Sequence, residues 1–267
     1  MADSVYISKN LTEEQLQFMQ RLDAAEILYF NMQEIEQQLG IKFKNLNEVL
    51  ENLIDKELLL RLERGKYAKA DYAEVFPLAS FLGKEGVISY WSALHRHGLT
   101  DRFPNTTFVK IDFRKKEGEI LASPIKYVSV KSAKKNFGAE TEGYGFNQFL
   151  ITNVETTLID CFDQRRYAGD FPDLIRAFAR ANLRNQILIE GCKVYQNIAL
   201  TKRLGYLASI CHAQKLSSFI RYAFSQVNSM YNLFEAGGPD KGAFNAEWKL
   251  RFNVSEAAIQ QMLNESY

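Results

Sequence analysis

The 267-residue chain lacks the features that would assign it to a membrane, secreted or fibrous class. No apolar run reaches the roughly 18 residues that a membrane-spanning helix needs. The start of the chain, Met1–Ser4, lacks the basic head and apolar stretch of a secretory signal. Three scattered cysteines without a Cys-x-x-Cys pair predict reduced thiols. We therefore expect a cytoplasmic protein with no membrane partner.

An excess of one charge sign is also missing, because 33 Lys and Arg residues face 32 Asp and Glu residues. Taken over the whole chain, this balance excludes a polybasic, histone-like nucleic-acid binder. The charge is nevertheless unevenly spread. Residues 1–80 hold nine basic and fourteen acidic residues, whereas residues 81–267 carry a net charge of +6. The question becomes which part of the chain contacts nucleic acid.

The sequence motifs of common enzyme classes are absent, including the glycine-rich phosphate loops and the serine-hydrolase and zinc-protease signatures. His95 and His97 are two residues apart, a poor spacing for two ligands on one helix. We expect no catalytic residue, no metal and no cofactor. The least favoured alternative is nucleic-acid chemistry at Asp160 and Asp163, which share a helix face at i and i+3.

Helix starts and stops are clearly marked in the first eighty residues. Capping signals open helices at Thr12, Asn31 and Asn45, and Gly40 ends the second helix. An alternating stretch then turns at Glu63-Arg64-Gly65 and runs on to Lys69, which predicts a hairpin. Helix, helix-turn-helix and hairpin, in this order, predict a winged helix-turn-helix domain over residues 1–72.

In such a domain the third helix would enter the DNA major groove and the hairpin would touch the phosphate backbone. Lysine and arginine can hold phosphates, and asparagine can read adenine edges. The predicted DNA contacts are Lys42, Lys44, Asn45, Asn47, Arg61, Arg64 and Lys66. The third helix also carries Glu48, Glu51 and Asp55, which would repel phosphates. The alternative is therefore a domain that contacts protein or acts as a spacer.

Residues 73–267 predict a mixed α+β domain, with a β-rich part to about residue 152 and a helical part after it. Residues 109–113 alternate in polarity, which predicts a strand with Lys110 on a solvent-exposed face. Further strands are expected at 125–131 and 146–152. Asn153 is positioned to cap a helix over 154–162, and helical patterns run over about 195–214 and 216–231.

Two basic regions stand out in this domain. Residues 110–135 hold eight basic and three acidic residues with aromatics between them, a composition suited to a nucleic-acid groove or to an ordinary solvated strand face. Three arginines at i, i+4 and i+8 predict a helical stripe for phosphates or an acidic partner, or an ordinary exposed helix face. The candidate contacts are Lys115, Lys116, Lys131, Lys134, Arg176, Arg180 and Arg184.

Four segments together resemble the AbiEi family of antitoxins from type IV, AbiE-type abortive-infection toxin–antitoxin systems. Their order and spread, from about residue 12 to residue 253, carry the resemblance. They are the hairpin Leu62–Tyr67, the Ser-Ala-Leu…His-Gly-Leu segment Ile88–Leu99, the Thr-x-x-Glu-x-Thr segment Ile151–Asp160, and Leu204–Leu207 with the later Trp248–Asn253.

The resemblance implies a winged-helix N-domain followed by an antitoxin domain without catalytic activity. It implies a protein that neutralises a nucleotidyltransferase-like toxin and represses its own operon by binding operator DNA, as part of phage defence. The acidic N-terminal region departs from what strong repression requires. The alternative function is a stand-alone winged-helix transcription regulator whose C-domain senses a ligand or a partner.

Overall fold

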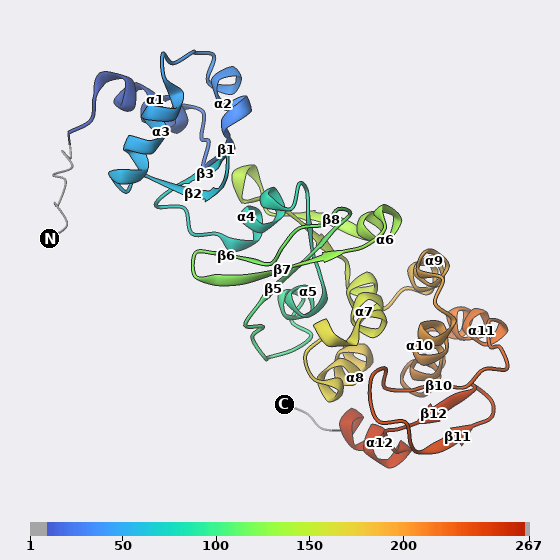
Figure 1. Cartoon of the computed structure of the whole chain (residues 1–267). Coiled ribbons are helices and arrows are strands. Elements are labelled where there is room, and N and C mark those ends of the chain that lie inside the picture. Colours follow the sequence, from blue (N-terminus) through green and yellow to red (C-terminus); the bar gives the residue numbers. More distant parts are fainter. Residues whose placement is uncertain (1–9, 265–267) are drawn as a thin grey trace, which may run out of the picture.

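The structure, a computed structural model, describes residues 10–264 and has a mixed α+β fold with small sheets. Met1–Ser4, on which the expectation of no secretory signal rested, lie outside the described residues. The molecule is elongated, with the N-terminal helices at one end and the last helix and its small sheet at the other (Figure 1). Within residues 10–264, every helix is too short or too polar to traverse a bilayer.

The N-terminal unit combines three helices with a three-stranded sheet. The predicted caps are confirmed, because Thr12 forms a capping box with Gln15, and Asn31 and Asn45 accept hydrogen bonds from the first turns of the helices they precede. Gly40 ends the second helix at a φ of +65°, which costs glycine little. The elements are α1 Glu13–Ala24, β1 Tyr29–Asn31, α2 Met32–Leu39, α3 Leu46–Asp55, β2 Leu59–Glu63 and β3 Lys66–Lys69.

The predicted hairpin is confirmed, and β3 lies between β2 and the short strand β1, antiparallel to both. Strand β1 was not predicted, since three residues are too few to display an alternating pattern. The apolar faces of α1, α2 and α3 enclose a core that includes Phe18, Leu22, Ile35 and Leu50. Each such side chain stabilises the fold by about 1.5–3 kcal/mol when fully buried.

The middle of the chain builds a six-stranded mixed sheet in the order β6-β7-β5-β4-β9-β8. Its central strand β4 has two residues and pairs antiparallel with β5 and parallel with β9. The elements are α4 Val75–Leu82, β4 Val87–Ile88, α5 Tyr90–Arg96, β5 Thr107–Ile111, β6 Gly118–Ile120, β7 Ser123–Ser129, α6 Ser132–Asn136, β8 Ala139–Glu142 and β9 Phe149–Thr152.

Both faces of this sheet are covered. Helix α4 packs on one face with Val109 and Ile111, and helices α5 and α7 (Val154–Asp163) lie on the other. The solvent-exposed face predicted for the strand at Lys110 is therefore wrong, because Lys110 is fully buried. The residues still alternate, but a strand buried on both faces directs every side chain into protein.

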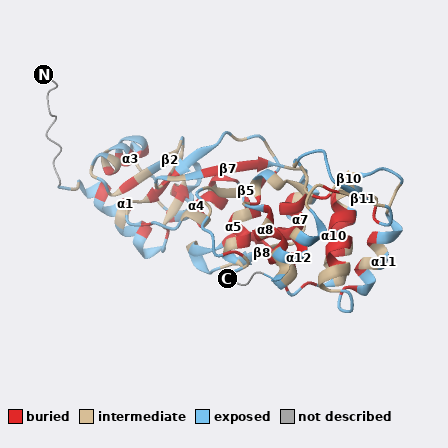
Figure 2. Cartoon of the chain, turned by 90° about the horizontal axis from the view of Figure 1, so that it is seen from below, coloured by how far each residue is buried: buried red, intermediate tan, exposed pale blue. Residues whose placement is uncertain are grey.

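The C-terminal half is mainly helical, as predicted, and its helices enclose the largest core (Figure 2). Asn153 caps α7 as predicted. A small three-stranded sheet in the order β10-β12-β11 and a final helix were not predicted. Beyond α7 the elements are α8 Phe171–Arg180, α9 Asn185–Tyr195, α10 Ile198–Cys211, α11 Ser217–Ser225, β10 Asn232–Leu233, β11 Ala243–Asn245, β12 Leu250–Phe252 and α12 Glu256–Asn264.

Aromatic side chains join the N-terminal unit to the central sheet. The Tyr29 ring of β1 contacts the rings of Tyr72, Phe81 and Phe146 at centroid distances of 5.7, 4.9 and 5.2 Å. The Tyr72 hydroxyl also lies 3.0 Å from the Phe146 carbonyl oxygen and 3.0 Å from the Asn147 side-chain oxygen, and it can donate a hydrogen bond to either. The hairpin β2–β3 is consequently held against the rest of the protein.

Candidate functional site

The predicted contact residues of the N-terminal unit fall into two groups. Lys42 and Lys44 are exposed in the turn before α3, and Asn47 is exposed in its first turn. Asn45 is also exposed, but its side chain is engaged as the cap, accepting from the Glu48 amide and donating to the Glu48 carboxylate at 2.9 Å. The start of α3 therefore offers two lysines and one amide that a ligand can reach.

The remaining exposed face of α3 is acidic. Glu51 and Asp55 follow Asn47 at intervals of four residues, so the three side chains form one stripe. Arg61 of β2 is exposed, but it forms an ion pair with Glu51. The guanidinium that was predicted to contact phosphate thus neutralises a carboxylate of the neighbouring helix.

The two basic residues at the hairpin turn have different surroundings. Arg64 is exposed at the tip, beside Gly65 with a φ of +76°. Lys66 turns inward and is only 14% exposed, with Nζ 3.0 Å from Glu63 and above the Phe81 ring of α4. Arg64 remains available to a phosphate, whereas Lys66 fastens the hairpin to helix α4.

Glu63 connects the hairpin to the basic turn of the middle region. Its second carboxylate oxygen pairs with Lys115, whose Nζ also lies 5.1 Å from the centre of the Tyr127 ring. Burial alone would raise the pKa of Glu63, but the hydrogen bonds from Lys115 and Lys66 outweigh it and lower that pKa. Lys115, predicted as a nucleic-acid contact, is therefore engaged within the protein.

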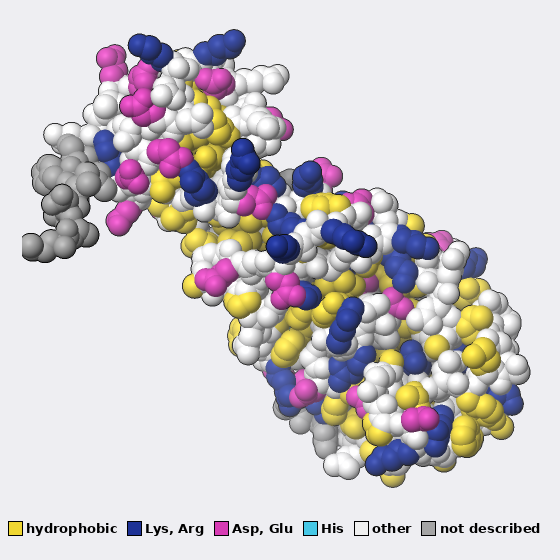
Figure 3. Space-filling model, in the orientation of Figure 1, with side chains coloured by type: hydrophobic (Ala, Val, Ile, Leu, Met, Phe, Trp, Pro, Cys, Tyr) yellow, Lys and Arg dark blue, Asp and Glu magenta, His cyan; other side chains and the backbone are white. Residues whose placement is uncertain are grey.

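Most of the eight basic residues in 110–135 form ion pairs. Lys134 lies 3.0 Å from Asp163 and Lys126 pairs with Glu117. The remaining exposed ones are Arg114, Lys116 and Lys131. Glu63 of the hairpin pairs with Lys115 of the middle region. Arg64 and Lys116 directly follow these two residues, so both lie at the edge where the hairpin meets the sheet. Figure 3 shows Lys and Arg side chains gathered over this part of the visible face.

The predicted arginine stripe is wrong as a continuous helical face. Helix α8 ends at Arg180, and Ala181 adopts an extended conformation, so Arg184 lies beyond the helix and immediately precedes α9. Arg176 is buried and pairs with Asp173. Arg184 binds the buried Glu155 carboxylate through Nε and Nη2, at 2.8 and 2.9 Å. At least Arg176 and Arg184 serve the packing of helices.

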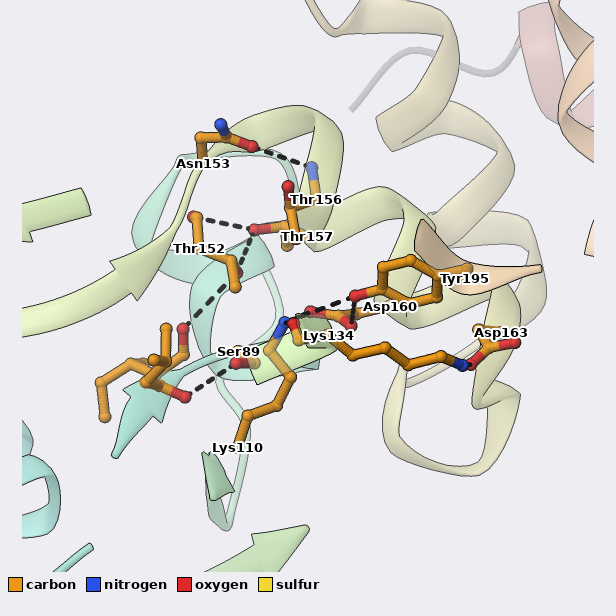
Figure 4. A network of polar contacts seen from close by, with 12 residues as sticks. Ser89, Lys110, Lys134, Thr152, Asn153, Thr156, Thr157, Asp160, Asp163 and Tyr195 are labelled. Carbon is orange, nitrogen blue, oxygen red and sulfur yellow. Dashed lines mark hydrogen bonds and ion pairs between the residues drawn. The ribbon is translucent and has the colours of Figure 1, made fainter. Parts of the chain in front are cut away.

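A buried polar network lies between the central sheet and the helical half (Figure 4). Lys110 Nζ is 2.8 Å from Asp160 Oδ2 and donates to the Lys134 carbonyl at 2.9 Å. The Tyr195 hydroxyl donates to Asp160 Oδ1. Burial lowers the pKa of Lys110 and raises that of Asp160, while their mutual attraction opposes both shifts. Four elements, β5, α6, α7 and α9, are joined at this point.

The second carboxylate proposed for catalysis is engaged beside this network. Asp163 accepts from Lys134 at 3.0 Å and from Asn197 at 2.8 Å, and an open cavity of about 930 Å³ lies next to it. Asp160 is enclosed and paired, so the two aspartates do not present a joint metal site to this cavity. Within residues 10–264, no three His, Cys, Asp or Glu side chains cluster in a metal-binding arrangement.

Comparison with known proteins identifies a shared fold and no family. No family model matches the chain, and no curated protein matches it significantly. A crystal structure of the RV2827C protein from Mycobacterium tuberculosis matches with a TM-score of 0.66, covering 99% of this chain and 99% of that chain at 14% sequence identity. At this identity the similarity concerns the fold alone.

Proposed function

We propose that this protein is the antitoxin of a type IV toxin–antitoxin pair and represses its own operon by binding operator DNA. The observation that carries the proposal is the four-segment resemblance to AbiEi antitoxins. Its support lies in how these segments pack. The second and third meet where β4 pairs with β9 and α5 contacts α7, and the fourth joins them through α10.

Specific contacts within these segments favour a shared structural framework. His97 Nε2 lies 2.7 Å from the Thr152 carbonyl, linking the second segment to the third. A Cβ on Gly205 would lie 2.5 Å from the Trp248 ring, so the two parts of the fourth segment approach as closely as glycine permits. Matching residues at such contacts are what a common fold would require.

The N-terminal unit supports DNA binding through its element order. Helix, short strand, two helices and a hairpin are the element order expected of a winged helix-turn-helix, in which α3 would be the recognition helix. Because α3 is acidic, we propose that the phosphate contacts come from its start and from the edge where the hairpin meets the sheet. These contacts are Lys42, Lys44, Arg64, Arg114 and Lys116.

Co-expression with the product of the adjacent gene tests the antitoxin role. Induction of that product alone should arrest growth, and this protein should restore it. If the product is harmless, or if growth is not restored, the antitoxin proposal fails. A gel shift on the protein's own promoter that persists in that case would favour the stand-alone regulator.

The DNA surface is tested separately with charge-reversal variants. Arg64→Glu and Lys116→Glu should each weaken operator binding to a similar degree on all sequences and reduce its salt dependence, because both would contact phosphate. Arg221→Glu, an exposed arginine of α11, is the matched control. If all three variants bind the operator as tightly as the unmodified protein, the phosphate contacts lie elsewhere on the molecule.

A further inference from the structure

Within residues 10–264, the small C-terminal sheet has an outer face that carries exposed and half-buried side chains. Leu250 and Phe252 of β12 point into the core, so Arg251 between them points to the opposite side. Lys249 directly precedes the strand and reaches the Tyr231 ring. Phe244 of β11 stands opposite Arg251 in the strand register. In Figure 3 the region of this sheet shows hydrophobic, basic and acidic side chains side by side.

Two aromatic rings are exposed on this face. Phe244 is 60% exposed and Tyr231, directly before β10, is 41% exposed. Their ring centres are 4.9 Å apart at an interplanar angle of 81°. Lys249 Nζ lies 5.3 Å from the Tyr231 ring centre, and the Arg251 guanidinium carbon lies 5.0 Å from that of Phe244. Each exposed ring is therefore accompanied by a cation.

Two buried cations lie beneath the same sheet. Lys202 Nζ donates to the Met230 carbonyl at 2.5 Å and to the Asn232 side chain at 2.9 Å, and Arg203 Nε donates to the Leu233 carbonyl at 2.8 Å. In the part of the chain that is described, neither cation has a carboxylate within ion-pairing distance. Burial, together with repulsion from Arg203 and Lys249, lowers the pKa of Lys202.

These contacts fix the segment that carries Tyr231 and place two cations beneath it. The carboxylate that does pair on this face is Asp240, at 2.5 Å from Arg251. An apolar peptide laid on the rings would leave Lys249 without a counter-charge. A chain that alternates flat rings with negative charges would satisfy both the aromatic and the basic groups.

We propose that the outer face of the β10-β12-β11 sheet binds single-stranded nucleic acid. Bases stack on Tyr231 and Phe244, while one phosphate lies against Lys249 and a second displaces the exposed carboxylate of Asp240 from Arg251. Lys202 and Arg203 act as positioning residues, because they hold the main chain of residues 230–233 from below. This activity is distinct from the proposed operator binding, which uses the other end of the molecule.

The test measures fluorescence anisotropy of labelled oligouridine and oligothymidine, each of about twelve nucleotides, with the full-length protein. The unmodified protein should bind, and Tyr231→Ala with Phe244→Ala should weaken binding about tenfold or more. The conservative pair Tyr231→Phe and Phe244→Tyr should retain binding because the rings remain. Preference for the uridine or the thymidine probe distinguishes RNA from single-stranded DNA.

Two controls separate stacking from other effects. Tyr144→Ala removes a tyrosine that is 82% exposed at a different place and should leave binding unchanged. Arg64→Glu should also leave it unchanged, even though that variant weakens the proposed operator contact. The proposal is overturned if no probe binds, or if the double alanine variant binds as well as the unmodified protein. Loss of toxin neutralisation in that variant, with no probe bound, would instead identify a protein-docking face.

Discussion

Lys110 and Asp160 form a buried ion pair, 2.8 Å apart, that joins strand β5 to helix α7. Neither side chain has appreciable contact with solvent. Such a pair adds little net stability over a well-packed apolar pair, but each partner becomes costly when the other is removed. The contribution of the pair to stability is therefore best measured by replacing one partner and then both partners.

Lys110→Met should lower the free energy of unfolding by about 3–5 kcal/mol, because it leaves the Asp160 carboxylate buried without its cation. Adding Asp160→Asn should recover part of this loss, since the amide can still accept from Tyr195. Urea denaturation measures both variants. Lys116→Met, at an exposed site, should change stability by less than about 0.5 kcal/mol. Strictly additive losses in the double variant would contradict coupling.

Arg184→Met should destabilise the protein by about 1.5–3 kcal/mol, the range for hydrogen bonds to a charged group. The arginine donates through two side-chain nitrogens to Glu155, which is almost fully buried. Thermal and urea unfolding report the effect, with Arg221→Met as the exposed control. A change in partner binding without a change in stability would show that Arg184 acts at a surface after all.

Glu63→Gln should lower stability at neutral pH, and the difference from the unmodified protein should shrink in acid. The pKa of Glu63 is lowered from its ordinary value of 4.5 in the folded state. Its contribution is therefore present above pH 4.5 and is lost as the pH falls through the folded-state pKa. Unfolding measured from pH 7 to pH 3 tests this. A difference that stays constant down to pH 3 would exclude titration of Glu63 as the cause.

Glu51→Gln should strengthen operator binding by the N-terminal unit, provided that this unit contacts DNA as proposed. The substitution removes a carboxylate from the α3 face and releases Arg61 from its ion pair. A plot of the logarithm of the DNA-binding constant against the logarithm of the salt concentration should become steeper by about 0.9, the slope of one phosphate contact. Glu247→Gln, exposed at the far end of the chain, serves as the matched control. Weaker binding by Glu51→Gln would mean that Glu51 itself contacts the DNA.

Local signals predicted local structure well. The caps at Thr12, Asn31, Asn45 and Asn153 were all confirmed, because a capping side chain and its amide lie within three residues. The prediction of the arginine stripe was wrong because the end of α8 is not marked by a local signal. Helix α8 ends at Arg180 without a Gly or Pro, and the contact of Arg184 with Glu155 beyond this end joins residues far apart in the chain.

Long-range pairing was beyond prediction from one sequence. Lys110 finds Asp160 and Tyr195 far along the chain, so its polarity wrongly indicated a solvent-exposed position. The strands of the C-terminal sheet have two or three residues each, too few to reveal a period. The sequence nevertheless held one signal for strand β12, because the basic residues Lys249 and Arg251 alternate with the apolar residues Leu250 and Phe252.

The central place of β4 in the sheet has a consequence for how the protein is made. Val87 pairs with Lys110 on one side and with Leu150 on the other, so the sheet cannot close until β9 has been synthesised. Until then β4 presents an unpaired edge, a feature that favours aggregation and proteolysis. A nascent chain that ends before residue 149 therefore exposes this edge of β4, whereas a chain that reaches residue 152 can pair β4 on both sides.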